Sequence, residues 1–230
     1  MNDMKIKGLN KLTLLDFPGR MACVVFLPSC NFRCPFCHNA SLVTAPSTQP
    51  DISEEEFFAF LEKRKGILEG VCITGGEPTL YPDLGAFIDR IKSLGFLVKL
   101  DTNGYNPDEL TNLLSKVDYV AMDIKNSPSK YAETVGVKNF DFDKIKRSVE
   151  ILESSGVEHE FRMTVAPELQ EESDFYAVQE WLKGVKKFYL QAYRDSGDVI
   201  NPIFSTPDED FLEKAKRILE KGIEKVEIRG

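Results

Sequence analysis

Six short apolar runs, each followed by a stretch with helical periodicity, predict an α/β fold in which parallel strands form an open partial barrel. The repeated order of strand and helix favours a parallel sheet with right-handed crossovers. A closed barrel of this kind takes about 250 residues, whereas this chain has 230 residues and six clear units. The predicted architecture is therefore an open (βα)6 barrel of the TIM type.

The strands are expected where apolar residues cluster between turn residues. The six runs are 21–27, 71–74, 97–100, 119–124, 160–165 and 187–192. A seventh short run, 225–228, predicts an edge strand near the end of the chain.

Each predicted helix has a recognisable start or stop. Ser53 and Glu56 form a capping box ahead of an apolar stripe. Gly95 follows a stripe that begins at Leu84, and Asn106-Pro107 begins the next helix. Further helices are expected over 141–155, from Ser173, and from Thr206-Pro207 to Gly222. The apolar stripes are typical of helix faces that pack on a core.

The length of the chain favours one domain over residues 1–230. An N-terminal segment (1–20) precedes six βα units (21–192), and a loop, a helix and a short strand follow (193–230). Segments 43–51 and 126–139 are expected to be irregular, the first because it is rich in turn-forming residues.

The charge and hydropathy patterns exclude some classes of partner. Net charge is −8, from 29 basic and 37 acidic residues, without a basic cluster. A nucleic-acid or membrane partner therefore has no electrostatic support. No apolar run reaches transmembrane length, and the first residues lack the apolar stretch of a secretory signal. We expect a cytoplasmic protein.

Three cysteines, Cys30, Cys34 and Cys37, lie in one loop after the first predicted strand, with the spacing C-x3-C-x2-C. Iron–sulfur clusters normally take four thiolates. Three thiolates can hold three irons of a [4Fe–4S] cluster and leave the fourth iron open, by analogy with open catalytic zinc sites. The loop therefore predicts a catalytic cluster.

Two other interpretations use the same loop. Structural zinc needs a fourth ligand, and His38, which directly follows Cys37, would be strained in the same tetrahedron. Cys34 and Cys37 also form a C-x2-C pair of the kind found in redox proteins. The other two cysteines, Cys23 and Cys72, sit in apolar runs and are expected to be buried, and an odd count argues against a disulfide framework.

Polar residues follow the carboxyl ends of the predicted strands, where parallel α/β sheets place their chemistry. These are Gly75-Gly76-Glu77-Pro78, Asp101-Thr102-Asn103-Gly104, Asp123 with Lys125, Arg162, and Tyr193-Arg194-Asp195. Paired glycines let a ligand approach the backbone closely, and Glu77 can accept hydrogen bonds from an amine. Taken singly, the same segments are plausible turns and strand-end ion pairs.

Together these motifs resemble the radical S-adenosylmethionine (SAM) superfamily. The resemblance rests on the cysteine loop, on Phe36 before its third cysteine, and on Gly75-Gly76-Glu77-Pro78. Within the superfamily the chain looks like the enzymes that activate glycyl radical enzymes. Their motifs are matched by Cys37-His38-Asn39, Asp101-Thr102-Asn103-Gly104 and Asp123-Ile124-Lys125. The form Asp16-Phe17-Pro18-Gly19-Arg20 and the short length are most like the branch that activates anaerobic ribonucleoside-triphosphate reductase.

The resemblance implies a role for each matching residue. Cys30, Cys34 and Cys37 would bind the [4Fe–4S] cluster, and its open iron would bind SAM. Gly75, Gly76 and Glu77 would hold the methionine amine, Phe36 and His38 would line the adenine, and Asn103, Asp123, Lys125, Arg162 and Arg194 would lie along the rest of SAM. Arg194 stands where some activating enzymes have a histidine. Asp101, Thr102 and Asp123 would form the monovalent-cation site of some activating enzymes.

The reaction and the partners also follow from the resemblance. One electron cleaves SAM to methionine and a 5′-deoxyadenosyl radical, which takes the Cα hydrogen of a glycine in a partner glycyl radical enzyme. Positions 38 to 74 hold no cysteine besides Cys72, so one cluster is expected and an external donor such as flavodoxin or ferredoxin would supply the electron. Segments 16–20 and 126–139 are candidate edges of the opening that admits the partner's glycine loop.

Three alternatives share parts of this pattern. The partner could be pyruvate formate-lyase or another glycyl radical enzyme. The chain could act on a small molecule, as 7-carboxy-7-deazaguanine synthase does. It could also be an iron-binding electron carrier that does not cleave SAM.

Overall fold

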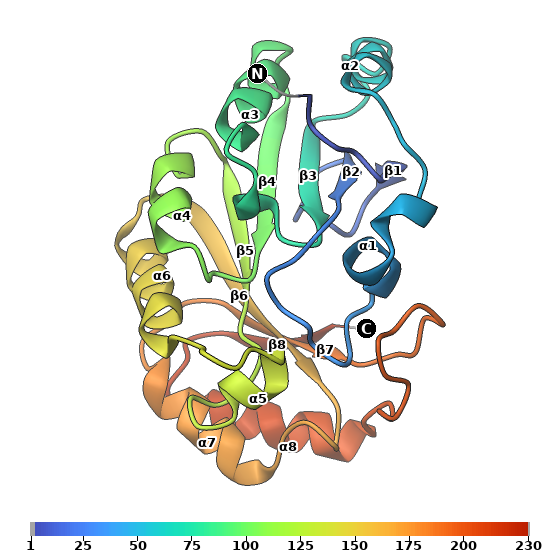
Figure 1. Ribbon diagram of the computed structural model, residues 1–230. Coiled ribbons are helices and arrows are strands. Elements are labelled where there is room, and N and C mark those ends of the chain that lie inside the picture. The colour runs from blue at the N-terminus through green and yellow to red at the C-terminus, as the bar shows by residue number, and fades with distance from the viewer. Residues whose placement is uncertain (1–2, 230) are drawn as a thin grey trace.

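The computed structural model describes residues 3–229, which fold around one eight-stranded sheet (Figure 1). The strands follow the order of the chain from one edge of the sheet to the other. Neighbours from β2 to β8 are parallel, and β1 pairs antiparallel with β2. Because β1 and β8 are separate edges, the sheet is open, as the sequence predicts.

All seven predicted strands are present, and their ends lie within two residues of the predicted ones. The strands are β1 (Gly8–Thr13), β2 (Ala22–Leu27), β3 (Gly70–Gly75), β4 (Leu97–Thr102), β5 (Tyr119–Asp123), β6 (Glu158–Val165), β7 (Phe188–Ala192) and β8 (Val226–Arg229). β1 was not predicted. It is an edge strand in which three consecutive residues, Asn10 to Leu12, are exposed, so it carries no continuous apolar run.

The helices are α1 (Ala40–Thr44), α2 (Glu54–Glu62), α3 (Leu84–Ser93), α4 (Pro107–Leu113), α5 (Tyr131–Val135), α6 (Phe142–Ser154), α7 (Glu172–Trp181) and α8 (Glu209–Leu219), with 3-10 turns at Pro46–Thr48 and Pro78–Leu80. The capping box of Ser53 and Glu56 is formed. α7 begins before Ser173 because Glu171 and Asp174 cap it reciprocally. α8 begins after Thr206-Pro207 because Asp208 accepts the N–H of Phe211. The two segments expected to be irregular contain short helices.

The predicted apolar stripes face the sheet. Figure 1 shows α3, α4 and α6 following one another along one side, with α7 and α8 at the far end. Their buried residues, such as Ile88, Ile145 and Val178, join one large core cluster with the apolar residues of the strands. This packing holds the strands in a curved row and leaves their carboxyl ends free to carry the site.

The segment 16–20 lies at the opposite end of the sheet from the cysteine loop. Thr13 pairs with Ala22, the first residue of β2, whereas the cysteine loop follows Leu27 at the other end of that strand. Phe17 is buried there and its ring is 6.1 Å from that of Tyr119. The prediction that 16–20 borders the opening was therefore wrong, because the unpredicted strand β1 carries the chain to the amino ends of the parallel strands.

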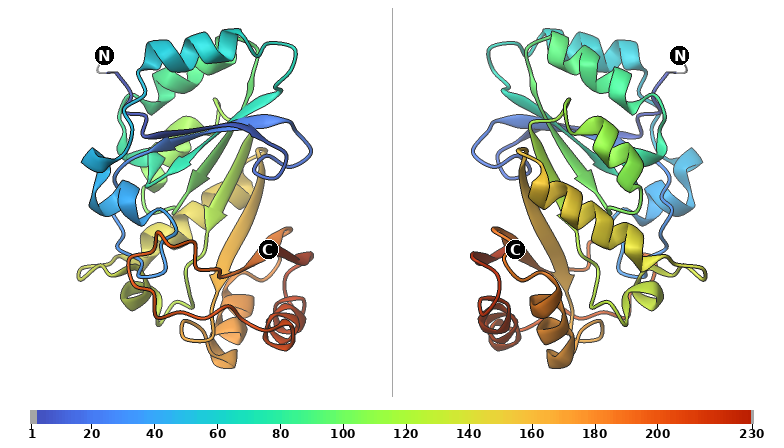
Figure 2. Two further views of the ribbon diagram at one scale, coloured as in Figure 1. Left: turned by 90° about the vertical axis from the view of Figure 1, so that its right-hand side faces the viewer. Right: turned by 90° about the vertical axis from the view of Figure 1, so that its left-hand side faces the viewer.

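The loop between β7 and α8 crosses back to the cysteine loop and α1 (Figure 2). The carboxylate of Asp198 accepts hydrogen bonds from the backbone N–H and the hydroxyl of Ser41, at 3.1 and 2.6 Å. The N–H of Asn201 donates to the carbonyl of Pro35 at 2.8 Å. These contacts link the loop after β7, near one edge of the open sheet, to the loop after β2, near the other edge. Within residues 3–229, no helix is both long enough and apolar enough to span a bilayer.

Candidate functional site

The three cysteines of the loop after β2 line one cavity of about 200 Å³ at the carboxyl ends of the parallel strands. The cavity also contains most of the other residues that the sequence singles out, namely Phe36, His38, Gly75, Gly76, Asp101, Thr102, Asn103, Asp123, Lys125 and Arg162. Two predicted site residues, Glu77 and Arg194, do not line it. The chain therefore brings together residues from five different strand ends.

All three loop thiols are free, and burial raises their pKa values. The pKa of Cys30 is about 11 and that of Cys34 about 12, although the nearby ammonium of Lys125 acts in the opposite direction. Thiols in this state are neutral at pH 7 and become thiolates when a metal binds them. The loop therefore presents three neutral thiols and has no activated nucleophile.

The spacing of the donors fits a cluster better than a single ion. Among residues 3–229, no three His, Cys, Asp or Glu side chains are placed to hold one metal ion. In a [4Fe–4S] cluster each cysteine binds a different iron, so thiols spread around a cavity suit it. The zinc interpretation finds no tetrahedral ligand set in this part of the chain.

Arg33 fixes the shape of the cysteine loop. Its guanidinium donates to the carbonyls of Cys30 and Phe32 at 2.6 and 2.7 Å, and its backbone N–H donates to Val135 at 2.8 Å. The last contact places segment 126–139, including α5, directly beside the loop. The loop is therefore braced by backbone hydrogen bonds before any cofactor arrives.

Gly75 and Gly76 pack against the backbone that leads into the cysteine loop. The φ of Gly75 is +116°, and a Cβ atom on Gly76 would lie 1.8 Å from the carbonyl oxygen of Ser29. The amide of Asn39 donates to the carbonyl of Gly75 at 2.8 Å. Both positions require glycine because the β2 and β3 loops touch there, and both residues line the cavity.

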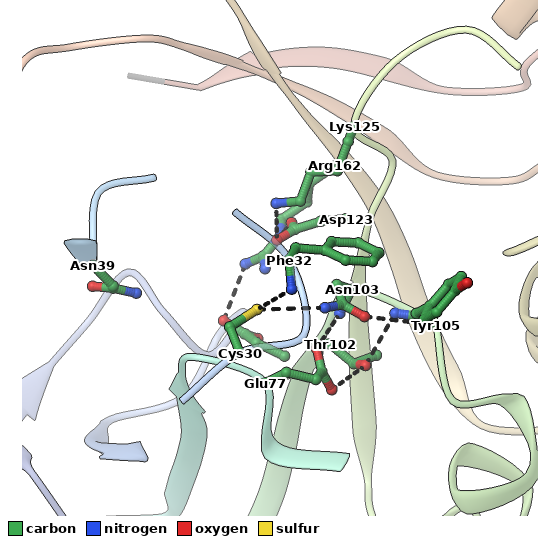
Figure 3. A network of polar contacts seen from close by, with 12 residues as sticks. Cys30, Phe32, Asn39, Glu77, Thr102, Asn103, Tyr105, Asp123, Lys125 and Arg162 are labelled. Carbon is green, nitrogen blue, oxygen red and sulfur yellow. Dashed lines mark hydrogen bonds and ion pairs between the residues drawn. The ribbon is translucent and has the colours of Figure 1, made fainter. Parts of the chain in front are cut away.

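The carboxylate of Glu77 points into the protein instead of the cavity, which corrects its predicted role as a side-chain acceptor for an amine (Figure 3). It is 1% exposed and accepts four hydrogen bonds. The donors are the N–H and hydroxyl of Thr79, the hydroxyl of Thr102 at 2.8 Å and the N–H of Asn103 at 2.7 Å. Burial raises the pKa of Glu77 while these donors oppose it. Glu77 thus joins the β3 and β4 loops.

Five charged side chains form a continuous row on the inner side of the sheet. Arg162 donates to Asp123 at 3.0 Å and to Asp101 at 3.3 Å, and Lys125 donates to Asp123 at 3.0 Å. Lys99, 1% exposed, is ion-paired with Asp101. Burial opposes the charged form of Asp123, but Arg162 and Lys125 lower its pKa to about 2. The row keeps both aspartates ionised beside the cysteines.

This row includes the two carboxylates of the predicted monovalent-cation site. Both carboxylates of that site, Asp101 and Asp123, are already paired with side-chain cations, and the hydroxyl of Thr102 is directed to Glu77. The ammonium of Lys99 supplies positive charge at Asp101. The cation site therefore stays a prediction, in which a monovalent cation would compete with Lys99 for Asp101.

Of the two predicted contacts His38 and Arg194, only His38 lines the cavity. His38 stacks on Tyr193 with ring centroids 5.3 Å apart and an interplanar angle of 20°, at the edge of the cavity. Arg194 is exposed and does not line the cavity, so its contact with the cofactor stays a prediction. Tyr193, the residue before Arg194, is buried.

Thr164 and Gln191 also line the cavity and were missed. Both lie at the carboxyl ends of strands, on β6 and β7, and share the inward face with Arg162. Alternation along β6 puts Thr164 on the same side as Arg162, two residues away. That periodicity is the signal that could have found them.

Known proteins match both the sequence and the fold. The Radical SAM superfamily pattern matches residues 24–182. A Methanocaldococcus jannaschii protein provisionally named a glycyl-radical enzyme activating enzyme is 30% identical over 97% of this chain and 95% of its own length. The pyruvate formate-lyase-activating enzyme of Clostridium pasteurianum is 26% identical over 93% of each chain. A 7-carboxy-7-deazaguanine synthase of Thermococcus kodakarensis is 28% identical over 75% of this chain and 74% of its own.

Among solved structures, Streptococcus suis SuiB bound to S-adenosylmethionine superposes with a TM-score of 0.66 at 14% identity. The match covers 90% of this chain and 52% of that one, so this chain spans about half of SuiB. At this identity the likeness shows the fold alone. The superfamily pattern, by contrast, covers well over half of the sequence and includes the cysteine loop. The chain belongs to the radical SAM superfamily, whose membership implies a [4Fe–4S] cluster and SAM as cofactors.

Proposed function

We propose that this protein activates a glycyl radical enzyme, and that the partner is anaerobic ribonucleoside-triphosphate reductase. The observation that carries the proposal is the meeting of three free cysteines, the paired glycines and the row of charges in one cavity. Two relatives that align along almost the whole chain are named for this activity. The Asp16-Phe17-Pro18-Gly19 form and the short length favour the ribonucleotide reductase branch.

In this proposal Cys30, Cys34 and Cys37 would hold three irons of the cluster and would leave the fourth open to SAM. Gly75 and Gly76, which line the cavity, offer backbone groups to the methionine end of SAM. Lys125 and Arg162, which are partly buried cations at the cavity wall, face the carboxylate or ribose region. Phe36 and His38 border the adenine.

The bound cofactors supply a one-electron cleavage of the SAM carbon–sulfur bond, which gives methionine and a 5′-deoxyadenosyl radical that takes one hydrogen atom from a glycine Cα. The protein itself supplies orientation and excludes water. No acid–base pair is needed, in keeping with the carboxylates at the site, since Asp101 and Asp123 are ion-paired and Glu77 accepts hydrogen bonds from its neighbours. The electron comes from an external carrier such as flavodoxin or ferredoxin.

The test is anaerobic reconstitution with iron and sulfide, followed by reduction and addition of SAM with or without the anaerobic ribonucleotide reductase of the same genome. We expect 5′-deoxyadenosine together with a glycyl doublet in the electron paramagnetic resonance (EPR) spectrum of the partner. Deoxyadenosine without a doublet, on every glycyl radical enzyme of that genome, would reject the activase role and keep only SAM cleavage.

A radical SAM enzyme that acts on a small molecule is the second candidate. The relative named 7-carboxy-7-deazaguanine synthase supports it, whereas Cys37-His38-Asn39 and Asp123-Ile124-Lys125 favour activation. The same assay separates the two, because a small-molecule enzyme would form deoxyadenosine with its own substrate and leave glycyl radical enzymes unchanged.

A further inference from the structure

The side-chain amide of Asn103 lies against the sulfur of Cys30. We propose that Asn103 sets the reduction potential of the cluster by donating an N–H···S hydrogen bond to this cysteine, and that it is a positioning residue acting through Cys30. The inference rests on the proposed function, in that Cys30 is taken as a cluster ligand. It gives Asn103 a role on the cluster in addition to the SAM contact that its place in the motif implies.

The amide of Asn103 is held from both ends. Its Oδ1 accepts the backbone N–H of Tyr105 at 3.0 Å, and its Nδ2 donates to Oδ1 of Asn31 at 2.7 Å. Because a backbone N–H can only donate, the contact with Tyr105 assigns the oxygen of the amide and turns the NH2 group toward the cysteine loop. Figure 3 shows the amide between Tyr105 and Cys30.

The second N–H of that group reaches the thiol. Nδ2 of Asn103 lies 3.7 Å from Sγ of Cys30, and the backbone N–H of Phe32 donates to the same sulfur at 3.3 Å. Within residues 3–229, no side-chain N–H donates to Cys34 or Cys37. Asn103 is 6% exposed, and its own backbone N–H is fixed by Glu77. The donor is therefore buried, oriented and specific to one of the three cysteines.

Hydrogen bonds to cluster sulfurs are one of the levers that set the potential of an iron–sulfur centre. Reduction adds one negative charge, which spreads onto the thiolates, so an N–H donor stabilises the reduced form more than the oxidised form. Removing the donor should make the midpoint potential more negative. At a fixed solution potential the ratio of reduced to oxidised cluster then falls.

Two substitutions separate this effect from the other contacts of Asn103. Asn103→Ser keeps an oxygen acceptor for the N–H of Tyr105, removes the amide donor and adds no charge. Asn103→Asp keeps the same acceptor at full length, removes the donor and adds a negative charge. We expect a more negative midpoint potential for the serine variant, and a still more negative one for the aspartate variant.

The measurement is a redox titration of the reconstituted holoenzymes without SAM, followed by the EPR amplitude of the reduced cluster. A tenfold change in the ratio of reduced to oxidised cluster corresponds to about 59 mV for a one-electron couple. A serine variant with the same midpoint potential as the wild type would overturn the inference, even if its melting temperature were lower. A purely structural residue would change the stability of the protein and leave the potential of the cluster unchanged. A shift in the aspartate variant alone would also overturn it, since charge would then be the cause.

If the serine variant assembles no cluster, we would test Asn103→Thr, which fills more space and keeps the hydroxyl acceptor. The same shift of the midpoint potential is expected for it, and its absence would overturn the inference. Iron content and SAM cleavage by the wild type are read on the same preparations. A wild type without a cysteine-dependent cluster would defeat the proposed function. A wild type that holds a cluster and cleaves SAM, with unshifted variants, would defeat only the role of Asn103.

Discussion

The hydroxyl of Thr102 donates a 2.8 Å hydrogen bond to the buried carboxylate of Glu77, and so joins the loop after β4 to the loop after β3 beneath the cavity. The backbone N–H of Asn103 meets the other oxygen of the same carboxylate at 2.7 Å. A residue that the sequence suggests as a ligand contact is thus a structural link between two strand ends. The cavity wall depends on it.

Replacing Glu77 by Gln should destabilise the fold. The amide nitrogen cannot accept from the N–H groups and hydroxyls that face it, so at least one buried donor is left unpaired, which costs about 1–3 kcal/mol. The free energy of unfolding in denaturant measures this. Glu55→Gln, on the exposed side of α2, is the matched control and should change little. Equal stability of the Glu77 variant and wild type would contradict the four-donor arrangement.

Replacing Gly76 by Ala should disrupt the approach of the β3 loop to the cysteine loop. The new Cβ would lie 1.8 Å from the carbonyl oxygen of Ser29, a backbone atom that cannot rotate away. We expect lower thermal stability and lower iron content after reconstitution. Gly156→Ala is the control, because no atom lies within 4 Å of the position of its Cβ. Similar iron content in both variants would show that the close contact does not matter for the loop.

The fold was largely readable from the sequence because its strands and helices obey local rules. Apolar runs mark the strands that are buried on both faces, and caps such as Ser53 with Glu56 mark helix starts. β1 was missed because an edge strand needs little apolar surface. That omission also misplaced segment 16–20, since the direction of the chain there depends on antiparallel pairing with β2.

The sequence predicts which strand ends carry the candidate site, but it does not predict the contacts among the side chains there. Motifs placed the cysteines, the glycines and Asp123 at one rim, and all of them line the cavity. The direction of the Glu77 carboxylate and the pairing of Lys99 with Asp101 depend on neighbours that are distant in sequence or hidden in a strand. Arg194 lies outside the cavity, although it follows the end of β7 by only two residues.

Cys34→Ala should abolish the cluster and SAM cleavage. Cys34 is buried in the middle of the loop and lines the cavity, and a cluster with two remaining protein thiolates is not expected to persist. Iron content, the absorbance of the cluster and the yield of 5′-deoxyadenosine should all fall to background. Cys72→Ala, at a buried cysteine outside the cavity, should keep all three. Normal SAM cleavage by the Cys34 variant would rule out the proposed ligand set.

Asp123 should make the fold sensitive to acid. Its pKa is about 2 in the folded chain and about 3.9 in an unfolded one. Because the folded pKa is the lower, the ion pair stabilises the protein above about pH 4, and this contribution is lost as the pH falls toward 2. The two values correspond to a contribution of about 2–3 kcal/mol. In Asp123→Asn the difference in unfolding free energy from the wild type should therefore shrink over this range. A difference that stays constant from pH 5 to pH 2 would argue against the pairing with Arg162 and Lys125.

Lys99 should make the protein indifferent to monovalent cations. Its ammonium is buried and paired with Asp101, where the sequence suggested a cation site. The melting temperature and SAM cleavage of the wild type should be equal in sodium, potassium and tetramethylammonium chloride at one ionic strength, because no inorganic cation is needed at Asp101.

Lys99→Met removes the ammonium charge and leaves Asp101 with Arg162 alone. It should lower the free energy of unfolding by about 3–5 kcal/mol, as expected when one partner of a buried pair is lost. Without the ammonium of Lys99, the carboxylate of Asp101 is open to small cations but not to tetramethylammonium. The stability of Lys99→Met should therefore be higher in potassium or sodium than in tetramethylammonium. A wild type that already requires potassium or sodium would mean that Lys99 does not replace the cation, and would restore the site of Asp101, Thr102 and Asp123.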